Sequence, residues 1–168
     1  MMSRIVSEAE RNMAAYSEVR RRRQREHVSV AEAICDSISQ AAEVLPMGAI
    51  AVFTETGNTA RTLSKYRPRV PIYAFSPFPA VCNRMNTLWG VQPMPWPRHS
   101  GLAEDMVVTA ERALLAQGSI QVGDVLGVVA GTQMSSGSTN FLRLHTVPHA
   151  DELERGRKPR RKARARKS

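Results

Sequence analysis

Three threonine hydroxyls surround a glycine in the segment Thr54–Thr59. An apolar run ends at Thr54, Gly57 permits a tight backbone turn, and residues 58–66 have a helical composition. Hydroxyl groups beside the free N–H groups of a helix start favour the binding of an anion. The segment therefore predicts a phosphate-binding loop, whose candidate residues are Thr54, Glu55, Thr56, Gly57, Asn58 and Thr59.

A second interpretation fits the same residues. Thr56 or Asn58 could simply cap the helix that follows, since both residue types are common at that position. The carboxylate of Glu55 also repels a phosphate unless its side chain points away. The pattern alone leaves a helix cap and a phosphate-binding loop open.

The elements that position this loop are predicted from apolar periodicity. Ser29 and Glu32 form a capping-box pattern, which begins a helix that Pro46 stops. The uniformly apolar run 125–130 predicts a central strand covered on both faces, and Pro93 places its own strand at an edge. Further strands are expected at 49–54, 72–76, 90–94 and 141–147, and helices at 58–66, 80–89 and 102–117. The fold class is α/β, a three-layer helix–sheet–helix sandwich with a mixed, mostly parallel sheet of about five strands.

The positive charge is concentrated in the last residues. The formal net charge is +9, and Arg155–Ser168 contains nine Lys or Arg and no acid, so residues 1–154 sum to zero. We expect an N-terminal helix and basic linker over 1–28, the α/β domain over 29–148, and a disordered basic tail over 149–168. The tail (Arg155 to Lys167) could contact nucleic acid weakly, serve as a solvated solubility tail, or contact an acidic membrane or protein surface. The run Arg20–Arg25 favours a solvated helix end over a nucleic-acid site.

The remaining chemistry-bearing residues suggest no catalysis. Cys35 and Cys82 lack metal or redox spacing and are expected to be buried thiols in a reducing compartment. No apolar run is long enough to span a bilayer, so a cytoplasmic location is expected. Each of the four histidines is expected at the surface rather than in a catalytic role: His27, His99, His145 and His149. No catalytic or metal-binding residue is predicted.

Several motifs, taken in order, resemble the C-terminal domain of pyruvate kinases. The resemblance covers about Met2 to Val147. It is carried by Thr54-x-Thr56-Gly57-x-Thr59-Ala60-Arg61, Ser64-Lys65-Tyr66-Arg67-Pro68, Trp89-Gly90-Val91-x-Pro93 and Gly137-Ser138-Thr139-Asn140.

The resemblance implies a regulatory domain that binds an allosteric activator. It assigns the segment Thr54–Thr59 to a phosphate of a sugar phosphate. It also assigns a second loop, which closes over the effector, to Ser136, Gly137, Ser138 and Thr139. The stretch 99–106 lacks the Trp and Arg that take the second phosphate in bisphosphate-regulated members. A monophosphate, inorganic phosphate or no effector is therefore expected rather than the bisphosphate.

The resemblance places the catalytic machinery outside this chain. The family's magnesium and potassium ions and its phosphoryl-positioning residues belong to a barrel that precedes this domain. Residues 2–10 resemble the last helix of that barrel. We therefore expect no cofactor and no phosphoryl transfer from this chain alone. The expected partners are a phosphorylated metabolite and either a second copy of the chain or a pyruvate kinase barrel, as in a fragmented or split enzyme.

Overall fold

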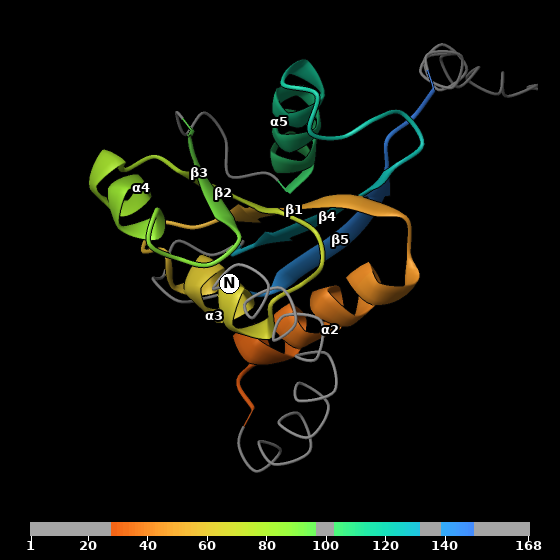
Figure 1. Ribbon diagram of the computed structural model, residues 1–168. Coiled ribbons are helices and arrows are strands. Elements are labelled where there is room, and N and C mark those ends of the chain that lie inside the picture. The colour runs from red at the N-terminus through yellow and green to blue at the C-terminus, as the bar shows by residue number, and fades with distance from the viewer. Residues whose placement is uncertain (1–27, 97–102, 132–138, 150–168) are drawn as a thin grey trace, which may run out of the picture.

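The computed structural model describes residues 28–96, 103–131 and 139–149. Within these residues, five strands form one sheet with helices on both of its faces (Figure 1). The elements in chain order are α2 (Val30–Val44), β1 (Met47–Phe53), α3 (Asn58–Tyr66), β2 (Ile72–Ser76), α4 (Pro79–Met85), β3 (Val91–Pro95), α5 (Ala103–Ala116), β4 (Val125–Ala130) and β5 (Phe141–Thr146).

The strand order is β3-β2-β1-β4-β5. Strands β1 to β4 are mutually parallel, and β5 pairs antiparallel with β4. The chain builds the sheet outward from β1 to β3 and then returns through α5 to place β4 on the other side of β1. The order of the strands therefore reverses between β1 and β4.

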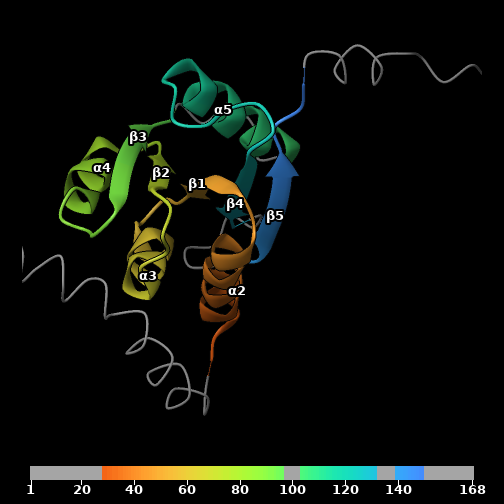
Figure 2. The same cartoon turned by 45° about the vertical axis from the view of Figure 1, so that its right-hand side comes forward.

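Two hydrophobic cores lie on opposite faces of the sheet. Helices α2 and α3 cover one face, α4 packs into the same core at the β3 edge, and α5 covers the other face (Figure 2). Alternate residues of β1 serve the two cores: Ile50 and Val52 face α2 and α3, whereas Ala51 and Phe53 face the α5 side. The three-layer α/β fold with a mostly parallel sheet is confirmed.

Several predicted elements have shifted boundaries. Strand β1 begins at Met47 rather than Ala49, and its register shifts across Gly48. A Cβ at Gly48 would lie 2.7 Å from Oδ2 of Asp124, so glycine permits this irregular start. Helix α4 ends at Met85 rather than Trp89, because a turn follows in which the Leu88 N–H donates to the Met85 carbonyl.

Other predictions agree with the structure or lie outside it. Ser29 and Glu32 make the complete capping box at the start of α2. Strand β4 is central between β1 and β5, and the Pro93 strand is at the edge. The predicted N-terminal helix, the tail from residue 150 onward, His27, His99 and the loop residues Ser136, Gly137 and Ser138 lie outside the described residues.

Candidate functional site

The loop after β1 begins with a hydroxyl that fixes its turn. The Thr54 N–H donates to the Phe75 carbonyl at 3.0 Å and so extends the pairing of β1 with β2. The Oγ1 atom of Thr54 then accepts from the Gly57 N–H at 2.9 Å. Thr54 is buried, with a relative exposure of 8%. Its hydroxyl therefore holds the loop in shape.

Gly57 is required in this turn for two reasons. Its φ of 84° lies in the left-handed region, which side chains with a Cβ rarely adopt. A Cβ at this position would also lie 3.3 Å from Cγ of Met85 and 3.5 Å from Cγ1 of Val81, both on α4. The loop is thus packed tightly against α4.

Helix α3 starts without a side-chain cap from its N-cap residue. The N-cap residue is Gly57 itself, and Asn58 is the first helical residue, so Asn58 is not the cap. The Thr56 hydroxyl accepts from the Asn58 N–H at 3.4 Å, which is long for such a bond. Of the helix-cap interpretation, only the weak hydrogen bond between the Asn58 N–H and the Thr56 hydroxyl is found.

The second predicted loop meets the first through one pair of hydroxyls. Oγ1 of Thr59 lies 2.7 Å from Oγ1 of Thr139, although the two residues are 80 positions apart in the chain. Thr139 has a relative exposure of only 5%. The Asn140 N–H, next in the chain, donates to the Ala130 carbonyl at 3.2 Å and fixes the end of this loop beside β4. Of the four residues predicted in the second loop, Thr139 alone lies in the described part of the chain.

The two loops leave the carboxyl ends of β1 and β4, the adjacent strands between which the strand order reverses. In open α/β sheets, ligands bind outside the carboxyl ends of the strands at such a reversal. The position of the loops is therefore the one that this class of sheet uses for ligands. Sequence periodicity could not place it, because periodicity does not give the order of strands.

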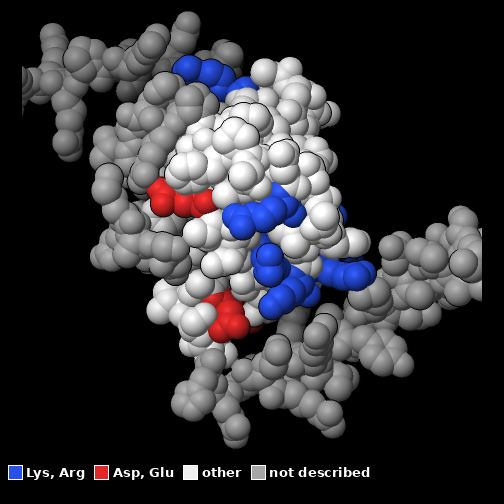
Figure 3. Space-filling model, turned by 90° about the vertical axis from the view of Figure 1, so that its left-hand side faces the viewer, with Lys and Arg blue, Asp and Glu red and all other residues white. Residues whose placement is uncertain are grey.

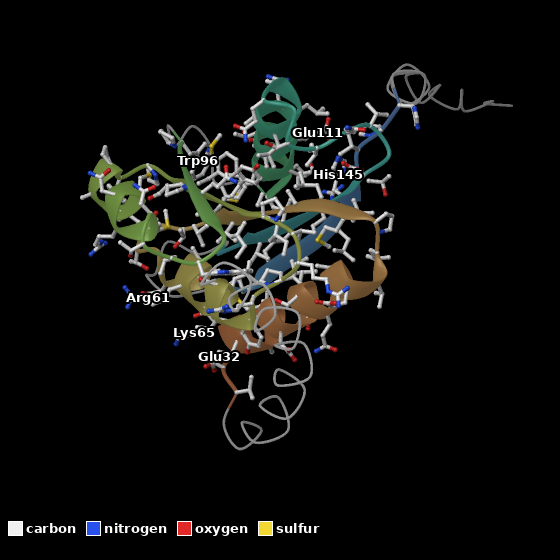
Figure 4. The ribbon with its side chains drawn as sticks, in the orientation of Figure 1. Glu32, Arg61, Lys65, Trp96, Glu111 and His145 are labelled. Carbon is white, nitrogen blue, oxygen red and sulfur yellow. The ribbon has the colours of Figure 1, made fainter. Side chains whose placement is uncertain are left out.

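An aromatic cluster at the same edge of the sheet was not predicted. The rings of Phe53 and Phe75 stack at 4.9 Å, and Trp96 meets Phe53 edge-on at 4.9 Å. The Trp96 N–H also donates to the Ser76 carbonyl at 3.0 Å. Figure 4 shows Trp96 just beyond β3 on the side of α5. The only sequence signal was the position of these residues at the ends of predicted strands.

The thiols lie on the helices that pack on one face of the sheet. Cys35 is fully buried, and this desolvation, with a smaller effect of the Glu32 charge, raises its pKa to about 12. Cys82 is only partly buried, which corrects the prediction of two buried thiols. It lies on the short helix α4 near the β3 edge, where desolvation raises the thiol pKa to a smaller degree.

His145 joins β5 to α5 through a hydrogen bond of 2.5 Å to Glu111, and both side chains are about one-fifth exposed (Figure 4). His145 pairs with Leu126, which pairs with Ala49 near the start of β1, whereas the Thr54–Thr59 loop follows the other end of β1. Across the described residues, no three His, Cys, Asp or Glu side chains cluster as metal ligands. The helices of the described ranges are too short or too polar to cross a membrane.

Comparison with known proteins connects this geometry to one family. Residues 32–145 match the model of the pyruvate kinase alpha/beta domain. The chain is 33% identical to a pyruvate kinase of Clostridium acetobutylicum over 147 residues, which is 87% of this chain and 31% of that protein. It is 37% identical to the enzyme of Lactococcus lactis over 119 residues, 71% of this chain and 24% of that protein.

A third relative, the pyruvate kinase of Sporosarcina psychrophila, is 30% identical over 156 residues. That alignment covers 92% of this chain and 26% of the relative. The chain thus spans less than a third of the length of the relatives that it matches.

Proposed function

The chain belongs to the family of pyruvate kinase alpha/beta domains, and from this premise we propose that it is a regulatory module that binds a phosphorylated metabolite. The binding site would be the Thr54–Thr59 loop with Thr139 at its side. The observation that carries the proposal is the 2.7 Å contact between the Thr59 and Thr139 hydroxyls. It joins the two loops at the place where this class of sheet binds ligands.

Hydrogen-bond roles support a phosphate ligand. A threonine hydroxyl has one proton to donate, and phosphate oxygens are acceptors. Thr56 accepts from a backbone N–H, which leaves its own proton available for donation. Of the two hydroxyls in the Thr59 and Thr139 pair, one donates to the other, so one proton also remains. The start of α3, which has no side-chain cap from Gly57, adds backbone donors and a favourable dipole.

The loop favours a small anion. Glu55 lies between Thr54 and Thr56 in the same turn, and its carboxylate opposes a high local negative charge. A sugar monophosphate or inorganic phosphate therefore fits the loop better than a bisphosphate. Binding would not need a metal, because hydroxyls and backbone N–H groups supply the donors.

The test is calorimetric titration of the full chain with fructose bisphosphate, glucose 6-phosphate, ribose 5-phosphate, AMP and inorganic phosphate. Thr56→Val should weaken binding by about 1.5–3 kcal/mol, the range for a lost hydrogen bond to a charged group. Thr87→Val is the matched control, because the Thr87 hydroxyl is exposed and donates to the Arg84 carbonyl instead. If no ligand binds the wild type at millimolar concentration, or if the two variants bind equally, the proposed site is wrong.

We further propose that the chain self-associates or joins a pyruvate kinase barrel. Strand β5 is an edge strand whose Leu144 side chain is 43% exposed, and an open edge of this kind favours pairing with another chain. Sedimentation of the wild type and of Leu144→Lys should separate the two cases. A self-associating chain would become monomeric in the variant, whereas a chain that is monomeric in both would contradict self-association.

The 168 residues alone should not transfer a phosphoryl group. Their match falls in the alpha/beta domain. The resemblance to the family implies that the metal and phosphoryl-positioning groups, on which phosphoryl transfer depends, belong to the barrel. Purified chain should therefore make no ATP from phosphoenolpyruvate and ADP. Turnover that disappears on mutation of a residue within this chain would contradict the proposal.

A further inference from the structure

Charge is unevenly distributed along residues 1–154, although their formal charges sum to zero. Between Glu55 and Glu104 the sequence contains no Asp or Glu. The described part of this stretch folds as α3, β2, α4 and β3. Its exposed cations on α3 and α4 and just after α3 are Arg61, Lys65, Arg67, Arg69 and Arg84. We call Arg61, Lys65, Arg67 and Arg84, together with Trp89, the basic face.

Contacts of α3 and of Arg67 with Trp89 hold much of the basic face together. Arg61 and Lys65 are one helical turn apart on α3, about 6 Å along its axis. The Ser64 hydroxyl donates to the Trp89 carbonyl at 2.8 Å, which attaches α3 to the turn after α4. The Arg67 guanidinium lies over the Trp89 ring, 5.0 Å from its centroid. Trp89 nevertheless keeps 43% of its surface exposed.

Figure 3 views this side of the molecule and shows Lys and Arg side chains gathered near its centre, with smaller acidic areas beside them. One acid at its border is Glu32, which Figure 4 places next to Lys65. Glu32 is already engaged by the backbone and hydroxyl of Ser29 in the capping box. Arg69 is excluded from the basic face because it forms an ion pair with Glu43 at 2.8 Å.

We propose that the basic face binds single-stranded nucleic acid, with Arg61, Lys65 and Arg84 on phosphates and Arg67 with Trp89 stacking on a base. Cationic surfaces that also offer planar side chains are typical of proteins that bind single strands. Unpaired bases stack on both tryptophan rings and guanidinium planes. The basic face shares no residue with the Thr54–Thr59 loop and does not depend on the proposed effector.

The stacked side chains of Arg67 and Trp89 distinguish a single strand from other polyanions as the ligand of the basic face. A duplex keeps its bases stacked on one another, so it could use the cations of the basic face but not Trp89. An anionic membrane surface would likewise attract the cations through its negative potential, without a base to stack. The exposed Trp89 ring, held by Arg67, therefore favours an unpaired strand.

The test measures how binding of a labelled oligouridylate of about twelve nucleotides depends on salt, with the full chain. The logarithm of the binding constant should fall with log salt by about 0.7 per phosphate contact. The double variant Arg61→Gln/Lys65→Gln should therefore lose about 1.4 from that slope. Its control is Arg112→Gln/Arg143→Gln, which removes the same charge from the exposed positions on α5 and β5.

Two substitutions of Trp89 test the stacking of a base. Trp89→Ala should weaken binding by roughly 5- to 150-fold, the range that base stacking spans, while leaving the salt slope unchanged. Trp89→Phe should restore much of the affinity. Circular dichroism and the melting temperature of each variant verify that the domain is folded, and Trp89→Phe keeps the test valid if Trp89→Ala unfolds.

Three outcomes would overturn the proposal. One is an equal loss of slope in the two double variants, which would mean only a general charge effect. Another is equal affinity of the wild type, Trp89→Phe and a folded Trp89→Ala. The third is an Arg61/Lys65 effect seen with anionic lipid vesicles but not with the oligouridylate. Loss of sugar phosphate binding in Thr56→Val leaves this proposal untouched, so the two sites are tested independently.

Discussion

The contact between Thr59 and Thr139 predicts a measurable coupling between the two loops. Replacing either residue by valine keeps the shape of the side chain and removes only the hydroxyl. In Thr59→Val the Thr139 hydroxyl, 5% exposed, loses its partner in a nearly dry position, which costs about 1–3 kcal/mol of folding free energy. In Thr139→Val the remaining hydroxyl belongs to Thr59, which is half-buried and reaches water more easily, so about 0.5–1.5 kcal/mol is expected.

The double variant should cost less than the sum of the two single changes. Replacing both partners by apolar groups of the same shape is nearly neutral, because no hydroxyl is left unpaired. The coupling free energy should therefore approach the sum of the two single losses, about 1.5–4.5 kcal/mol. Urea unfolding followed by circular dichroism gives each free energy, provided that the dependence on urea is the same in all variants.

A second double-mutant cycle, of Thr56 with Thr139, supplies the control. Thr56 and Thr139 share no hydrogen bond in the structure, since the Thr56 hydroxyl accepts from the Asn58 N–H. The coupling between Thr56→Val and Thr139→Val should stay within about 0.5 kcal/mol of zero. If the Thr59 and Thr139 cycle gives no larger value than this control, the two loops are not joined by their hydroxyls, and the argument for a shared site fails.

Two further predictions concern reactivity and packing. A thiol-reactive maleimide should modify Cys82 first and Cys35 only on unfolding. Cys35 is fully buried and its pKa is raised to about 12, whereas the thiolate is the reactive form. Equal rates in the Cys35→Ser and Cys82→Ser variants would contradict this order. Gly57→Ala should destabilise the domain more than Gly90→Ala. Both glycines have positive φ, but the added Cβ meets Met85 at 3.3 Å only at Gly57, whereas nothing lies within 4 Å at Gly90. Equal losses of unfolding free energy would show that α4 yields to the new methyl group.

Local patterns predicted the elements well where one interaction dominates. The capping box needs only Ser29 and Glu32, three residues apart, and it forms as expected. Helix α3 has the predicted bounds, since Gly57 and Pro68 leave little choice. The start of β1 was missed because it depends on Gly48 and on the approach of Asp124 from a distant turn. A local pattern carries no information about that contact.

The assembly of the candidate site depends on strand order rather than on local pattern. An apolar run such as Val125–Ala130 indicates that β4 is central, but it does not say which strands are its neighbours. Only when β4 lies beside β1 does the loop that ends at Thr139 reach Thr59. The same return of the chain through α5 leaves the acid-free segment from α3 to β3 on one side of β1. One topological step therefore both joins the two predicted loops and groups the elements that carry the basic face on one side of β1.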